Sequence, residues 1–187
     1  MTKNTALVVG ISGQDGAYLA HILLSKGYQD YGASGDAKAS RFRNLTRLGI
    51  KNQVQLHSAS PSDFRSTLSI LTMVEPDEIY NLAGQSSVVL SFDQPVGTVE
   101  SVIVGTLNIL ECIRYVKLPL RMFDAISSAC FGDTNEPAND GTPFRPCGLY
   151  AIAARMSRGS WGSSADCRNL RCRRIHHVIR YRPQPIG

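Results

Sequence analysis

The stretch Thr5-Ala-Leu-Val-Val-Gly-Ile-Ser-Gly-Gln-Asp-Gly16 decides how this chain folds. Its short apolar run indicates a strand that is buried on both faces of a parallel sheet. Three glycines follow in the pattern G-x-x-G-x-x-G, and residues 14–26 then predict a helix that ends at Gly27. The first glycine permits a tight turn, the second lets the backbone approach a ligand, and the third lets the helix pack on the strand. The alternative is a glycine-rich turn that only connects the two elements.

The alternation of strand and helix patterns continues along the chain. Further strands are predicted at residues 28–34, 54–57, 77–82 and 120–125, and further helices at 64–74 and 96–116. This order predicts a doubly wound parallel α/β sheet of the Rossmann type over residues 1–154. In such a sheet the free N–H groups and the dipole of the first helix attract phosphates, so the glycine pattern predicts nucleotide binding.

Two details of the pattern carry further expectations. Asp30 falls in the middle of the second predicted strand, where a carboxylate buried on both sides would be unfavourable. In the helix at 64–74, we expect Phe64, Leu68, Leu71 and Met73 to supply most of the apolar face.

Charge is distributed unevenly along the 187 residues. The formal net charge is +5, but residues 1–154 hold 12 Lys and Arg against 14 Asp and Glu, a balance of −2. Residues 155–187 hold 8 Arg and 1 Asp, a balance of +7. The basic character therefore belongs to the tail, and we expect no nucleic-acid binding by the folded body.

Cysteine usage and hydropathy indicate the compartment. The chain has 5 cysteines, an odd number, and lacks a C-x-x-C motif, so neither a disulfide framework nor a metal site is expected. It has no unbroken run of 18 or more apolar residues, and the run at residues 6–9 is too short for a signal peptide. We expect a cytoplasmic protein without membrane contact.

Small polar residues cluster where the predicted strands end. They are Asn81, Gln85, Ser86, Ser127 and Ser128. Because ligands of open parallel sheets bind across the carboxyl ends of the strands, these side chains are expected to converge on one crevice. Ordinary turn capping by Asn and Ser is the alternative for each residue taken singly.

The choice between NAD and NADP stays open at this stage. Asp36 stands about 20 residues after Gly16, where an acidic residue would hold the ribose of NAD. Arg41 and Arg43 lie close by and would favour NADP, although they could equally form a solvated surface cluster.

Longer segments resemble a known family. Gly13-Gln-Asp-Gly-Ala-Tyr-Leu19, Glu78-Ile-Tyr-Asn-Leu-Ala-Gly-Gln-Ser-Ser87 and Thr142-Pro-Phe-Arg-Pro146 are similar to segments of GDP-mannose 4,6-dehydratases, which belong to the extended short-chain dehydrogenases/reductases. The resemblance covers residues 5 to about 153. It implies conversion of GDP-mannose to GDP-4-keto-6-deoxymannose by a lyase with bound NADP, with NAD as the less favoured cofactor, and a homo-oligomer in the intact family.

The resemblance also implies roles for individual residues. In the family, hydride leaves C4 of the sugar, a glutamate takes the C5 proton, water leaves from C6, and the hydride returns to C6. Ser127 stands at the position that binds the 4-hydroxyl, and Tyr150 at the position of the catalytic tyrosine. The cofactor-contacting positions are Gly10, Ile11, Ser12, Gly13, Gln14, Asp15, Gly16, Leu82, Ala83, Gly84, Gln85, Ser86 and Tyr150.

The chain departs from the family pattern at several of these positions. Ala129 replaces the glutamate, and Ala154 replaces the lysine whose charge favours the phenolate of the tyrosine one helical turn away. Gly35 stands where an arginine favours NADP, and Cys147 begins the segment that replaces Arg-Ser-Pro before the tyrosine. We therefore expect little activity from this chain.

The Arg-rich residues 155–187 fit neither helix nor strand periodicity. One interpretation is a basic interaction tail. The other, which we favour, is translation out of frame, because codons for Asp166-Cys-Arg-Asn-Leu-Arg-Cys172 can read Thr-Ala-Glu-Thr-Tyr-Gly in the neighbouring frame. On that interpretation the tail has no native structure, and the family's C-terminal substrate domain is absent.

Two other functions stay open beside the dehydratase. One is a related nucleotide-sugar epimerase or dehydratase that acts on another sugar. The other is a catalytically inactive NAD(P)-binding module that regulates a partner, which the missing glutamate and lysine would favour.

Overall fold

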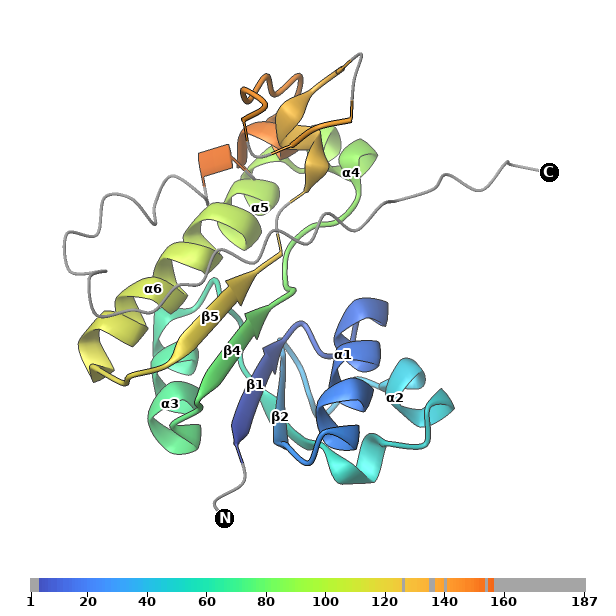
Figure 1. The fold of residues 1–187 in the computed structure, drawn as a ribbon, viewed down its shortest axis with the longest axis vertical. Helices are drawn as coiled ribbons and strands as arrows, with labels where there is room; N and C mark the ends of the chain where they lie inside the picture. Colours follow the sequence, from blue (N-terminus) through green and yellow to red (C-terminus); the bar gives the residue numbers. More distant parts are fainter. Residues whose placement is uncertain (1–3, 126, 135–136, 140, 154, 157–187) are drawn as a thin grey trace.

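The computed structural model describes residues 4–125, 127–134, 137–139, 141–153 and 155–156. Its centre is a 5-stranded sheet with the strand order β3-β2-β1-β4-β5 (Figure 1). The strands are β1 (Thr5–Val9), β2 (Gln29–Ser34), β3 (Gln55–Ser58), β4 (Glu78–Asn81) and β5 (Arg121–Asp124). All the strand pairs are parallel. The predicted doubly wound parallel sheet is confirmed, and each strand lies within a residue of its expected bounds.

Helices cover both faces of the sheet (Figure 1). One face carries α1 (Gln14–Ser25) and α2 (Arg43–Arg47), and the other carries α3 (Phe64–Val74) and α6 (Gly105–Val116). Strand β1 supplies side chains to both cores, because successive residues of a strand point to opposite faces. Its Ala6 and Val8 belong to the cluster with α1, whereas Leu7 and Val9 belong to the cluster with α3 and α6.

The long helix expected at 96–116 is interrupted. It consists of α5 (Pro95–Val99), a π-helical turn η2 (Glu100–Val104) and α6. Four short elements were not predicted: α2, α4 (Val88–Asp93) and the 3₁₀ turns η1 (Lys51–Gln53) and η3 (Ser128–Phe131). Each is too short to show a helical period in the sequence.

The prediction of which residues form the apolar face of α3 was partly wrong. Phe64 and Met73 are exposed, at 40% and 57%. The buried residues of α3 are Thr67, Ile70, Leu71 and Val74, which follow the i, i+3, i+4, i+7 spacing of one helix face. A threonine can occupy this face because its hydroxyl donates within its own turn, to the carbonyl oxygen of Asp63 at 3.0 Å.

The helix at Pro95–Val116 is long and apolar enough to cross a membrane by length and composition. Here its C-terminal part packs on the sheet, with Ile109, Leu110 and Ile113 buried beside α3. The buried core helix of a sheet layer passes the same test of length, and we interpret this helix as one.

Asp30 is the unfavourable feature that the sequence indicated. It lies on β2 beside Ala6 of β1, is 1% exposed, and has no hydrogen-bond partner for either carboxylate oxygen among the described residues. Burial raises the pKa of Asp30 to about 7, because loss of water disfavours the charged form. The folded state therefore favours a protonated, neutral side chain at this position.

A second buried carboxylate, Glu78, lies in the same row of the sheet on the other side of Ala6. Unlike Asp30, it is fully partnered. It accepts hydrogen bonds from the hydroxyl groups of Tyr80 at 2.6 Å and Tyr28 at 3.4 Å, and it forms an ion pair with Arg121 of β5. These donors stabilise the charge that burial alone would disfavour.

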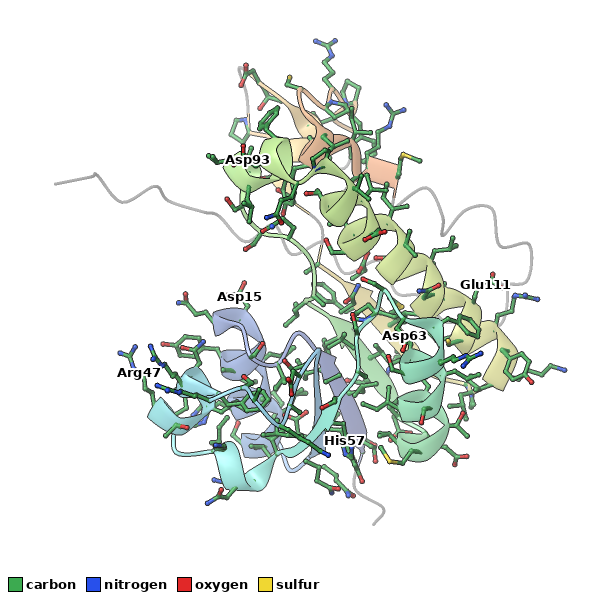
Figure 2. All side chains as sticks on the ribbon, turned by 180° about the vertical axis from the view of Figure 1, so that it is seen from behind. Asp15, Arg47, His57, Asp63, Asp93 and Glu111 are labelled. Atoms are coloured by element: carbon green, nitrogen blue, oxygen red, sulfur yellow. The ribbon has the colours of Figure 1, made fainter. Side chains whose placement is uncertain are left out.

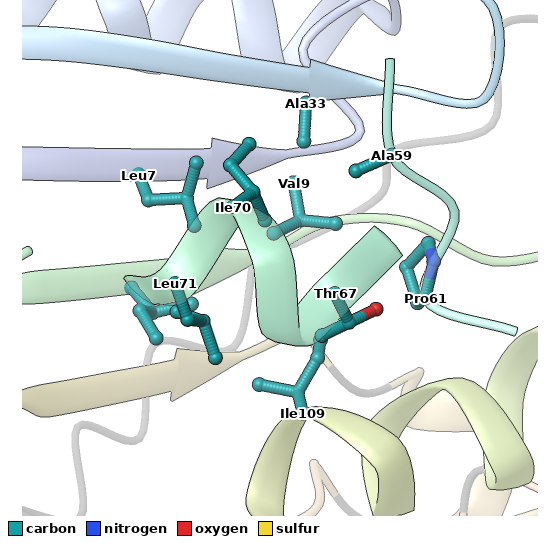
Figure 3. Close-up of a pocket in the computed structure, with 10 residues that line it drawn as sticks. Leu7, Val9, Ala33, Ala59, Pro61, Thr67, Ile70, Leu71 and Ile109 are labelled. Atoms are coloured by element: carbon teal, nitrogen blue, oxygen red, sulfur yellow. The ribbon is translucent and has the colours of Figure 1, made fainter. Parts of the chain in front are cut away.

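A small cavity lies between the sheet and α3 (Figure 3). Thr67 is the polar residue of its lining, and the apolar residues include Leu7, Val9, Ala33 and Ile109. The centre of a water molecule could move within a volume of about 10 Å³ in this cavity, which is close to the minimum needed to hold one water. We interpret it as a packing defect of the core, and no ligand of useful size would fit there.

The expected tail begins within a helix. Residues 149–153 and 155–156 are helical, so Arg155 and Met156 have regular structure, contrary to the expectation that the unstructured tail begins at residue 155. The remaining prediction, for residues 157–187, lies outside the part of the chain that the structure describes.

Candidate functional site

The turn between β1 and α1 is held by its own glycines. Gly10 has φ +89°, and a Cβ atom there would lie 2.8 Å from the backbone of Leu82 and Ala83. A Cβ atom at Gly16 would lie 2.5 Å from the carbonyl oxygen of Gly10. Both glycines are therefore required by the close approach of backbone to backbone. This contact also brings the turn against the loop that follows β4.

Gly13 has a different environment from the other two glycines. Its φ of −69° is ordinary, it is exposed, and a Cβ atom would lie 3.3 Å from the Gly10 oxygen, which is tight but no clash. Gly13 caps α1 without any side-chain hydrogen bond, so the first N–H groups of the helix are open to a ligand. A side chain at residue 13 would cover these groups.

The expected contact residues of this turn divide into two sets. Ser12, Gln14 and Asp15 are exposed, and Figure 2 shows Asp15 at the N-terminal tip of α1. Ile11 is fully buried and packs against Gly32 of β2, where a Cβ atom would lie 2.6 Å from its side chain. Ile11 therefore supports the turn from inside the core and exposes no surface in this structure.

Helix α2 approaches the glycine turn, which the sequence did not reveal. Asn44 donates its side-chain amide to the carbonyl oxygen of Ser12 at 3.2 Å. The neighbouring Arg43 is exposed, as is Arg41. Asp36 accepts the backbone N–H groups of Lys38 at 3.0 Å and Ala39 at 2.9 Å with one oxygen. Its carboxylate thus shapes the turn after β2.

The loop after β4 forms the second wall of the candidate site. Leu82 and Ala83 pack against the two cores with their side chains, so they offer only backbone to a ligand. Gly84 and Ser86 are exposed, and Gln85 is half-buried. The Gln85 side chain accepts the N–H group of Ser87 at 3.2 Å.

Asn81 does not belong to the open crevice as expected. It is buried and donates to a carboxylate oxygen of Asp124 at 2.7 Å, while its own side-chain oxygen accepts the N–H group of Ala83 at 3.3 Å. These bonds join β4 to β5 and fix the start of the loop. For Asn81 the capping alternative holds.

Ser127 follows β5 at the same edge of the sheet. It caps η3, and its hydroxyl oxygen accepts the N–H group of Ala129 at 3.2 Å. A serine hydroxyl that accepts one bond still has a hydrogen to donate, so Ser127 can also bind a substrate hydroxyl. Ser128 is exposed within η3.

Tyr150 lies in the helical residues 149–153 and is half-buried. The segment before it is tied to η3, because Arg145 donates its N–H group to the carbonyl oxygen of Cys130 at 3.1 Å. Phe131 and Phe144 also stack at a centroid distance of 5.2 Å. The structure thus joins the segments that carry the two expected catalytic residues.

Two alanines, Ala129 and Ala154, stand where the resembled family has charged residues. Ala129, which the resemblance aligns with a glutamate, has only a methyl group as its side chain. Ala154 lies outside the described residues. Within the described ranges, no group of three or more His, Cys, Asp or Glu could hold a metal ion.

A parallel sheet with a glycine turn that opens onto a helix N-terminus defines this chain as a Rossmann-fold protein. The family model described as GDP-mannose 4,6 dehydratase matches residues 7–161. The chain belongs to this family, and the match continues past Ala153, where the resemblance had been expected to stop.

Individual relatives agree with this assignment. A GDP-mannose 4,6-dehydratase of Vibrio cholerae is 38% identical and a GDP-mannose 4,6 dehydratase of Drosophila melanogaster is 41% identical. The alignments cover 82% and 79% of this chain but 43% and 40% of the relatives. The chain therefore spans less than half the length of these curated relatives.

Solved structures of similar fold include two UDP-glucose 4-epimerases. The enzyme of Thermus thermophilus, in complex with NAD, has a TM-score of 0.77 and 23% identity. The match covers 89% of this chain and 52% of the epimerase chain. The enzyme of Brucella ovis, also in complex with NAD, has a TM-score of 0.79 and 18% identity. That match covers 90% of this chain and 50% of the epimerase chain. At these identities the likeness concerns the fold.

Proposed function

We propose that this chain is the dinucleotide-binding part of a GDP-mannose 4,6-dehydratase, and that NADP is its cofactor. The observation that carries the proposal is the environment of Gly13. Gly10 and Gly16 are explained by contacts within the chain, whereas Gly13 leaves an uncapped helix N-terminus open to solvent. Such a site suits a pyrophosphate, because the N–H groups and the helix dipole favour negative charge. The solved epimerases of similar fold are complexes with NAD, which supports a nicotinamide dinucleotide.

The preference for NADP over NAD is the finer part of the proposal. The bond from Asn44 to Ser12 brings the start of α2, with the exposed Arg43, close to the glycine turn. A guanidinium there would suit the 2′-phosphate of NADP. It would take the place of the arginine that the resemblance expects at Gly35. The carboxylate of Asp36 holds its own turn with one oxygen, which leaves its second oxygen as the acceptor for a ribose hydroxyl of NAD.

The catalytic residues of this chain are expected to act weakly. A bound nicotinamide supplies the acceptor for hydride. Ser127 would donate a hydrogen bond to the 4-hydroxyl of the sugar. Tyr150 would take the proton of that hydroxyl as hydride leaves C4. Ala129 can hold no proton from C5, and Ala154 brings no positive charge to Tyr150. Loss of a general base commonly costs about 10²–10⁴ in rate.

The names of the relatives support GDP-mannose as the substrate and a lyase reaction. We further propose a cytoplasmic location and a homo-oligomer. The alternative of a catalytically inactive dinucleotide-binding module is favoured by Ala129 and Ala154. Substrate turnover separates it from the dehydratase, because both would bind the cofactor.

The test is a titration of the folded protein with NADP and with NAD by isothermal calorimetry. We expect binding of both, with a lower Kd for NADP. Substitution of Arg43 by Gln should weaken NADP binding and leave NAD binding nearly unchanged, and Arg65→Gln, at an exposed arginine on α3, serves as the control. If folded protein binds neither dinucleotide, the proposed function is wrong.

A further inference from the structure

The π-helical turn η2 interrupts the longest helix of the described chain beside the candidate site. Its defining bond runs from the N–H group of Gly105 to the carbonyl oxygen of Glu100, five residues back instead of four. Single π turns within α-helices frequently mark functional sites, so the contacts of this turn need an explanation.

The turn lies between two sets of contacts. C-terminal to it, Gly105 packs on Pro61, where a Cβ atom would lie 3.0 Å from the proline ring, and Asn108 donates to the Pro61 oxygen at 2.8 Å. These contacts fix α6 against the loop after β3. Within the turn, Ser101 and Val102 instead meet the loop after β4.

The contact with that loop is specific. The hydroxyl oxygen of Ser101 accepts the backbone N–H group of Gln85 at 3.2 Å, and the same hydroxyl donates to the carbonyl oxygen of Thr98 at 3.2 Å. The Thr98 bond fixes the direction of the hydroxyl, so its lone pair is directed at the loop. Beside it, Gly84 has φ +147° and a Cβ atom there would lie 3.4 Å from Val102.

Other bonds fix the start of the loop and its internal turn. Leu82 donates to the carbonyl oxygen of Val9 at 2.9 Å, and Ser87 donates to the side chain of Gln85 at 3.2 Å. The bond from Gln85 to Ser101 joins the middle of the loop to η2. The loop backbone lies against Gly10 at one end, so the loop stands directly beside the glycine turn.

We infer that Ser101 is a positioning residue for dinucleotide binding, held by the π turn so that its hydroxyl fixes the loop at Gly84–Ser86. This inference rests on the proposed function, because it assumes that this loop contacts a dinucleotide. Ser101 acts through the Gln85 backbone and makes no contact of its own with the ligand.

The experiment compares Ser101→Ala, Ser101→Thr and the control Ser69→Ala, an exposed serine of α3. We expect Ser101→Ala to raise the Kd for NADP about fivefold, the effect of one lost hydrogen bond, and to speed amide exchange at Gln85. Threonine keeps a hydroxyl that can bond a carbonyl three or four residues back, so Ser101→Thr should restore both properties. Ser69→Ala should change neither.

The unfolding midpoint is measured for every variant. Should Ser101→Ala unfold, Ser101→Cys keeps the size and a weak acceptor, and intermediate values of Kd and exchange are then expected. If the parent protein binds NADP and Ser101→Ala binds it equally well, the inference about Ser101 is overturned while the proposed function stands. If the parent protein itself binds no dinucleotide, the proposed function fails, and this inference fails with it.

Discussion

The glycine turn after β1 and the segment after β5 lie at the same edge of the sheet, but they are built differently. In the glycine turn the backbone packs so closely that a Cβ atom at Gly10 or Gly16 would lie only 2.5–2.8 Å from other backbone atoms. In the described residues between Ser127 and Tyr150, the chain is held by hydrogen bonds from Ala129 and Arg145 and by the stack of Phe131 on Phe144. On the proposed function, the first region would bind the dinucleotide, whereas the second would lack the base and the positive charge at residues 129 and 154. Binding and turnover should therefore separate in this protein.

The largest expected effect concerns turnover. With GDP-mannose and NADP, this chain should form product at least about 10²–10⁴ times more slowly than an ordinary enzyme that turns over near 1 s⁻¹. The reason is that Ala129 and Ala154 supply neither base nor charge. Chromatography of the 4-keto-6-deoxy product measures the rate. Turnover near 1 s⁻¹ would show that other residues perform the chemistry and would remove the contrast between the two regions.

The next effect concerns Asp30, which weakens the region that holds the glycine turn. Its pKa is 3.8 in the unfolded chain and about 7 when folded. The contribution of Asp30 to stability is therefore greatest near or below pH 4, falls as the pH rises to about 7, and is level above that. At about 1.4 kcal/mol per unit the loss is about 4 kcal/mol, a large share of the 5–15 kcal/mol typical of domains.

Urea unfolding at pH 5 and pH 8 tests this expectation. Asp30→Val should raise the free energy of unfolding by more at pH 8 than at pH 5, because at pH 8 the parent protein must hold the buried carboxylate in its charged form. Asp93→Asn, at an exposed position, is the control. Equal gains at both pH values would mean that Asp30 is not protonated on folding. A melting midpoint above that of ordinary mesophilic domains would contradict the weak folding expected here.

A smaller effect tests whether Gly13 serves the ligand and not the fold. Gly13→Val should raise the Kd for NADP at least about tenfold, or about 1.4 kcal/mol, because a side chain would cover the N–H groups of α1. The unfolding midpoint should change little, since the φ of −69° suits valine. Gly97→Val, with open space around residue 97, is the matched control. Loss of folding in Gly13→Val would make all three glycines structural.

The smallest effect concerns the cavity beside α3. Val9→Ile adds one methylene group toward it and should stabilise the fold by about 0.8 kcal/mol. The same change at the exposed Val96 should have almost no effect. Denaturant titration measures both. A destabilised Val9→Ile would show that the cavity cannot accept a further carbon and that this core is already full.

The sequence predicted the sheet well because a buried parallel strand leaves a continuous apolar run, as at Thr5–Val9. It also indicated that Asp30 was misplaced. It could not place α2 or α4, whose few residues show no period, and it misjudged the face of α3 because Thr67 hides its polar group within its own turn. At the site, the sequence placed Asn81 in the open crevice and did not indicate Ser101, since both residues act through tertiary hydrogen bonds that no local pattern records.

The strand order β3-β2-β1-β4-β5 has a consequence for the order of folding. During synthesis the first three strands emerge together and can pair as they appear, but β1 meets β4 only after a gap of some seventy residues, where Ala6 pairs with Glu78. Until then, one side of β1 is an open edge in an apolar strand, which is the kind of surface that pairs with other chains. A ribosome that pauses before Glu78 would prolong the time during which this nascent chain can aggregate.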